Sequence, residues 1–127
     1  MKYKNIEIQI NFEEEESRKH LEEDFNVLLE KGIENIIIES FIPWLLGTDS
    51  KDINQNKIFK GLDLYEIDYS YSKIVAQYSP TGKEEYFGEF KFCFESGNRH
   101  TSDLLEAAAM EVYILDGEIV KIESYDI

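Results

Sequence analysis

An alternation of aromatic and polar residues limits most strongly what this chain can fold into. In the run Phe90-Lys91-Phe92-Cys93-Phe94, every second side chain is a phenylalanine. A period of two residues is typical of a β-strand that buries one of its faces. The run is therefore predicted to be a strand whose phenylalanines face a core and whose Cys93 faces away from it.

Other segments carry strand signals of the same kind. Residues 6–12 alternate isoleucine or phenylalanine with polar side chains, and residues 74–78 continue a strand pattern. Residues 65–71 are predicted to place tyrosines and Ile67 on one face and Glu66, Asp68 and Ser70 on the other. Asp116-Gly117 separates residues 112–115 from residues 118–125, and this dipeptide favours the type I′ turn of a β-hairpin.

Helical spacing is clearest near the N-terminus. Leu21, Phe25, Leu28 and Leu29 follow the acidic run 13–16, which suits the first turn of a helix, and Gly32 suits its end. Residues 33–46 fit either a second helix or, at 36–38, a buried strand. We favour a short helix that ends near Phe41, because Pro43 interrupts what precedes it. Two further helical turns are expected at 104–110, after the capping-box spacing of Asp103 and Glu106.

The predicted order of elements is β-α-α-β-β-β-α-β-β over a single domain, residues 1–127. Early helices followed by consecutive strands indicate the α+β class. We expect an antiparallel sheet of about five to six strands, with two N-terminal helices packed on one face.

Charge narrows the range of partners. Asp and Glu number 27 against 13 Lys and Arg, which gives a formal net charge of -14. This charge disfavours nucleic acids and anionic membranes, and it favours rapid encounter with a basic protein. With one cysteine, no apolar signal segment and no long apolar run, we expect a cytoplasmic protein.

No motif indicates catalysis, a metal or a cofactor. His20 and His100 lack zinc-ligand spacing, and isolated glycines form no phosphate-binding loop. His100 follows an aromatic strand and precedes Asp103, so it fits either a general base or a loop residue before a helix cap. Cys93 is interpreted as a buried, unreactive thiol. We therefore expect neither cofactor nor catalytic residues and lean against an enzyme.

A partner-binding surface is the hypothesis that the residues favour. Tyrosine combines a large contact area with a polar tip, and the second half of the chain is rich in it. Carboxylates beside aromatic side chains suit the recognition of a basic protein. The predicted contact residues are Trp44, Asp63, Glu66, Asp68, Tyr69 and His100.

Two resemblances bear on function. The stretch Gly88 to Phe94, the polar break with His100 and the hairpin at 112–122 resemble small bacterial domains of unknown function found among toxin-immunity genes. That resemblance implies an immunity-type protein. The hairpin at 116–125 is also similar to the one that closes members of the nuclear transport factor and ketosteroid isomerase superfamily. That likeness implies a cone-shaped pocket between sheet and helices.

Three functions follow from these patterns. The first is a non-enzymatic immunity or inhibitor-type protein that neutralises a basic protein partner. The second is a small-ligand binder or enzyme with a pocket between the sheet and the helices. The third is a structural domain that dimerises through a strand edge or an aromatic sheet face. We expect either a monomer or a homodimer.

Overall fold

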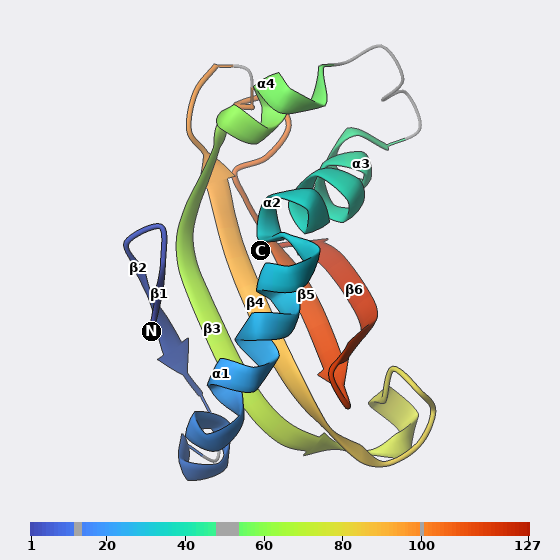
Figure 1. The fold of residues 1–127 in the computed structure, drawn as a ribbon. Coiled ribbons are helices and arrows are strands. Elements are labelled where there is room, and N and C mark those ends of the chain that lie inside the picture. The colour runs from blue at the N-terminus through green and yellow to red at the C-terminus, as the bar shows by residue number, and fades with distance from the viewer. Residues whose placement is uncertain (12–13, 48–53, 100) are drawn as a thin grey trace.

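A computed structural model describes residues 1–11, 14–47, 54–99 and 101–127. One sheet runs through the molecule in the order β1-β2-β3-β4-β5-β6. Helices α1, α2 and α3 lie across one face of this sheet (Figure 1). The predicted α+β class, with N-terminal helices on one face of a largely antiparallel sheet, is confirmed.

The strands lengthen from the N-terminal edge towards the middle of the sheet. Their bounds are β1 (Lys2–Tyr3), β2 (Ile6–Ile10), β3 (Leu62–Ile74), β4 (Glu85–Ser96), β5 (Ala107–Leu115) and β6 (Glu118–Asp126). The predicted strand of phenylalanines is part of β4. The predicted Asp-Gly hairpin joins β5 to β6, and both turn residues have the positive φ of a type I′ turn, 50° at Asp116 and 79° at Gly117.

Most helical residues belong to the connection between β2 and β3. They form α1 (Glu14–Lys31), α2 (Ile33–Ile36), the π-helical turn η1 (Ile37–Phe41), α3 (Ile42–Leu46) and α4 (Gln55–Lys60). A short 3₁₀ turn, η3 (Ala76–Tyr78), follows β3. No helix in the described part of the chain is both long and apolar enough to cross a membrane.

The pairing of β2 with β3 departs from the antiparallel expectation. These strands run parallel, with Ile8 opposite Ile67 and Ile10 opposite Tyr69, whereas every other neighbouring pair is antiparallel. Parallel neighbours need a long crossover, which a tight turn cannot supply. The helical connection is that crossover, and it carries α1 across the sheet.

Residues 33–46 are helical, as we favoured, but the helix does not end at Phe41. The chain continues through α3, where Pro43 lies in the first turn. Proline lacks the N–H that an α-helical bond would use, and it tolerates the first turn of a helix best. The π-helical turn η1 immediately before it changes the spacing of the backbone hydrogen bonds, so that the helical path continues through Pro43.

Three other local predictions are wrong, the first because pairing between strands overrides local preference. Residues 107–110 belong to β5 and not to a helix. There Ala108 pairs with Phe94 and Ala109 with Cys93, and both alanines are fully buried. Residues 76–78 form η3 in place of a strand. Leu29 is exposed, so it does not share the buried face of α1 with Leu21, Phe25 and Leu28.

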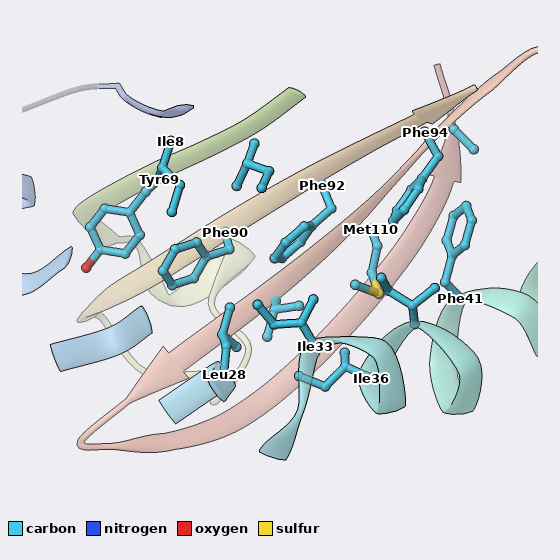
Figure 2. Packing of buried hydrophobic residues seen from close by; sticks show 14 of the residues in the cluster. Ile8, Leu28, Ile33, Ile36, Phe41, Tyr69, Phe90, Phe92, Phe94 and Met110 are labelled. Carbon is cyan, nitrogen blue, oxygen red and sulfur yellow. The ribbon is translucent and has the colours of Figure 1, made fainter. Parts of the chain in front are cut away.

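A continuous core fills the space between the helices and the sheet. Phe90, Phe92 and Phe94 point from β4 towards the helices, where they meet side chains that include Leu28 and Phe41 (Figure 2). The rings of Phe41 and Phe94 stack with centroids 4.5 Å apart. Because successive strand residues face opposite ways, this packing turns the odd-numbered side chains of β4 away from the helices.

One buried polar link ties α1 to the sheet. Tyr69 is fully buried, and its hydroxyl donates a hydrogen bond of 2.5 Å to Asp24 Oδ2 on α1. Burial raises the pKa of the Asp24 carboxyl, while the bond from Tyr69 and the charge of His20 oppose that rise. Gly88 on β4 lies beneath this pair, and a Cβ atom there would overlap Asp24 Oδ2 and lie 3.0 Å from the Tyr69 hydroxyl. Gly88 therefore makes room for the link.

Substitution of Gly88→Ala should destabilise the fold by about 2–3 kcal/mol, because the new methyl group displaces the Asp24 carboxylate from Tyr69. In an Asp24→Ala background the same substitution should cost less than about 1 kcal/mol, since the overlapping atoms are gone. Urea denaturation of the two single variants and the double variant measures both costs. An equal cost of Gly88→Ala in both backgrounds would contradict the proposed contact.

Candidate functional site

The face of the sheet turned away from α1, here named the open face, carries most of the ionisable side chains of the sheet. Strand register arranges them in rows. One row crosses β3 to β6 as Asp68, Lys91, Glu111 and Glu123. The rows on either side are Glu66, Cys93, Ala109 and Tyr125, and Ser70, Glu89, Tyr113 and Lys121. Carboxylates thus outnumber lysines on this face.

A β-bulge in β3 adds Asp63 to the open face. Register shifts between Leu64 and Glu66, so that Asp63 pairs with Glu95 while Glu66 pairs with Cys93. Simple alternation would place Asp63 and Glu66 on opposite faces. The extra residue, Tyr65, reverses that parity, as a bulge does. The predicted acidic residues Asp63, Glu66 and Asp68 are therefore brought together on one face.

Glu111 lies at the centre of a hydrogen-bonded group. Its two carboxylate oxygens accept bonds from the hydroxyls of Tyr113, at 2.9 Å, and Tyr125, at 2.5 Å. Its side chain also shares a hydrogen bond with Glu89 on the neighbouring strand. Lys91 approaches from the same row, with its ammonium 5.8 Å from the ring centroid of Tyr125. The tyrosines and Glu89 thus hold the Glu111 carboxylate in place.

Glu89 is a carboxyl group of this cluster whose pKa is raised. Partial burial raises its pKa from 4.5 to about 7, and the negative charge and hydrogen bond of Glu111 add to the rise. Two carboxyl groups in contact cannot both ionise at the ordinary pKa, because each opposes the charge of the other. At neutral pH this pair therefore holds a proton that a nearby positive charge could displace.

Glu66 and Asp68 form a second carboxyl pair one row away. Burial raises the pKa of Asp68, and Glu66 raises it further through its charge and a shared hydrogen bond. The thiol of Cys93 lies 3.8 Å from Glu66 Oε2, and ligand atoms of these three residues lie within 4.8 Å of one another. Burial raises the pKa of Cys93 to about 11, so the free thiol stays protonated at neutral pH. The paired carboxyl groups can also accept hydrogen bonds from an ammonium or guanidinium group.

The other predicted contact residues lie elsewhere. Trp44 is 38% exposed on α3, on the helical side of the sheet, and packs against Phe41. Tyr69 is buried in the core, so it cannot meet a partner at the surface. His100 lies outside the described residues. Of the predicted set, the open face thus contains Asp63, Glu66 and Asp68.

Sequence reasoning missed Glu89, Glu111, Tyr113 and Tyr125 as members of the site. The signal for Glu89 was present, because it alternates with Phe90 and must face away from the core. The contact between Glu89 and Glu111 depends on the register of β4 against β5, which no local pattern reveals. His20, which is partly exposed on α1, stacks on Tyr71 with ring centroids 3.7 Å apart.

Comparison of the chain with protein-family models, with curated proteins and with solved structures found no match. Function is therefore argued from the geometry of the open face. Its paired carboxyl groups can accept hydrogen bonds from basic side chains, and its tyrosines offer flat apolar area beside them.

The raised pKa of Glu89 predicts a pH dependence of stability. Between the ordinary pKa of 4.5 and about 7, the folded state binds more protons at Glu89 than the unfolded state does. Its contribution to the free energy of unfolding should therefore fall as pH rises through this range and level off above it. Glu89→Gln keeps the neutral form, so its stability relative to the original chain should increase from pH 5 to pH 8. Urea denaturation across this range tests the prediction, and parallel curves for both proteins would refute it.

Proposed function

We propose that this chain is a non-enzymatic binding protein of the immunity or inhibitor type, whose open face binds and neutralises a basic protein. The supporting observation is the concentration of partly exposed carboxylates on a sheet face that α1 does not cover. These residues are Asp63, Glu66, Asp68, Glu89, Glu95, Glu111 and Glu123. The resemblance to domains found among toxin-immunity genes is consistent with the proposal.

The carboxyl pairs explain why a basic partner suits this face. Asp68 and Glu89 each have a raised pKa beside another carboxyl group, so the free protein pays an electrostatic cost on this face. An arginine or lysine placed against a pair removes that cost and takes over the role of the shared proton. Lys91 lies between the two pairs and offsets their charge only in part.

Aromatic area supplies the second component of such an interface. Tyr65 is 42% exposed at the bulge, and Tyr113 and Tyr125 are half-buried beside the carboxylates. Tyrosine is enriched at protein interfaces, because it buries a large area with little loss of side-chain entropy. The same acidic face disfavours a homodimer formed through it, since like charges would meet across the twofold axis.

Neutralising the open face should weaken binding to a basic probe. We expect the triple variant Asp63→Asn, Glu66→Gln, Asp68→Asn to lose about tenfold in affinity for a nona-arginine peptide at low salt. The matched control Glu15→Gln, Glu22→Gln, Glu30→Gln removes the same charge from exposed positions of α1 and should change affinity far less. Titration calorimetry measures the affinities, and amide chemical shifts locate the peptide.

Equal losses in the two triple variants would show that only net charge matters, and would refute a specific face. The natural partner can then be sought with the same proteins. A basic protein captured from a host lysate by the original chain and by the α1 variant, but lost with the open-face variant, would support the proposal.

Binding of a basic partner should also depend on pH through Glu89. A positive charge against Glu89 favours its ionised form, so the affinity for nona-arginine should rise as pH increases from 6 to 8. Arginine does not titrate in this range. The Glu89→Gln variant should lose the pH dependence, and a rise that persists in this variant would assign the effect to another group.

A further inference from the structure

A recess of about 410 Å³ lies at the edge of the sheet, and Asp63 is the one carboxylate of the open face that borders it. It lies among the β1–β2 hairpin, η1, α4 and the first residues of β3, whose elements are shown in Figure 1. The main core contains the tightly packed phenylalanines of Figure 2, and the recess borders it at Phe94 and Ile37. Its size falls within the range of small-molecule sites.

Strand pairing explains why the recess exists. β2 pairs with β3 only from Ile67 to Tyr69, whereas β3 begins at Leu62. The β1–β2 hairpin turns at Lys4 and Asn5, both with positive φ, so no strand in the described part of the chain pairs with this side of β3 over residues 62–66. Residues 62–66 of β3 are therefore bordered on this side by side chains and not by another strand.

The walls of the recess are apolar but incompletely covered. Most of these side chains pack against the core while remaining partly exposed. They are Tyr3, Ile6, Phe59, Leu62 and Leu64. A gathering of half-buried apolar groups around a hollow is the composition of a ligand site, since a ligand can complete the burial.

Two lysines at this recess distinguish it from the rest of the molecule. Lys4 and Lys60 line it, against one carboxylate, Asp63. The ammonium of Lys4 is 3.0 Å from Glu34 Oε1 and 5.3 Å from the ring centroid of Phe59. Lys60 makes no ion pair with any residue that the structure describes. The other recesses described each have more carboxylates than cationic side chains in their walls.

We infer that this recess binds a small amphipathic carboxylate, with its apolar body against Phe59, Leu64 and Phe94 and its carboxylate near Lys60. A lysine ammonium beside an apolar wall favours a ligand with an anionic head, because the ion pair is strengthened where water is partly excluded. In a chain with a net charge of -14, an anion is repelled from most of the surface. At this recess, Lys60 offsets that repulsion.

Octanoate, octanamide and octylamine provide matched probes, because they share an apolar chain and differ in the charge of the head. We expect octanoate to bind more tightly than octanamide, and octylamine to bind weakest at this site. Amide chemical shifts of the ¹⁵N-labelled protein should change at the recess, around Leu62 and Phe59. Titration of these shifts measures each affinity.

Matched variants on α4 test the role of the lysine. Lys60→Gln should weaken octanoate binding about three- to tenfold and leave octanamide unchanged. Lys57→Gln removes the same charge from an exposed position of the same helix that does not line the recess, and should have little effect. Both substitutions are at exposed positions, so the fold is retained.

Three outcomes would overturn the inference. They are a lack of octanoate binding at millimolar concentration, equal affinity for octanoate and octanamide, and shift changes spread over the whole surface. Equal losses of octanoate affinity in Lys57→Gln and Lys60→Gln would show that only the overall charge of α4 matters, and would refute a specific role of Lys60. None of these outcomes bears on the binding of nona-arginine at the open face, so the two proposals fail separately.

Discussion

The buried hydrogen bond between Tyr69 and Asp24 is the constraint on which the arrangement of this molecule depends. It joins the middle of α1 to the middle of β3, and it needs the bare backbone of Gly88 beneath it. A buried carboxyl group is costly without a partner, so the helix is held at one position and one rotation over the sheet. Since strand residues alternate, fixing Tyr69 towards the helix also turns Asp68 outward.

The composition of both faces of the sheet follows from this orientation of β3. On the helical side, aromatic rings and isoleucines exclude water. The Ser17 hydroxyl accepts a bond of 2.9 Å from the Tyr71 amide and thus links α1 directly to β3. On the open side, Glu89 and Glu111 meet across neighbouring strands, and Glu66 and Asp68 meet along β3. The strand arrangement that packs one face tightly therefore also places charged side chains close together on the other face.

Local patterns predicted the elements whose signals are local. The alternation in β4 and the Asp116-Gly117 turn were identified because period and turn chemistry act within a few residues. Residues 107–110 were misassigned, because alanine favours a helix until a neighbouring strand lies beside it. The parallel pairing of β2, the bulge that moves Asp63 and the contact of Glu89 with Glu111 all depend on register between distant segments. Local sequence patterns carry no information about strand register.

The long crossover between β2 and β3 divides the chain into parts that assemble at different rates. Strands β3 to β6 are consecutive antiparallel neighbours, whereas β2 reaches β3 only after the whole helical connection is in place. Contacts close in sequence form fastest, so we expect the four-stranded meander to form before α1 docks on it when the unfolded chain refolds. During that interval its phenylalanine face is exposed to other chains. Charged groups oppose the association of exposed apolar strands, so we expect the carboxylates on its reverse side to reduce self-association in that interval.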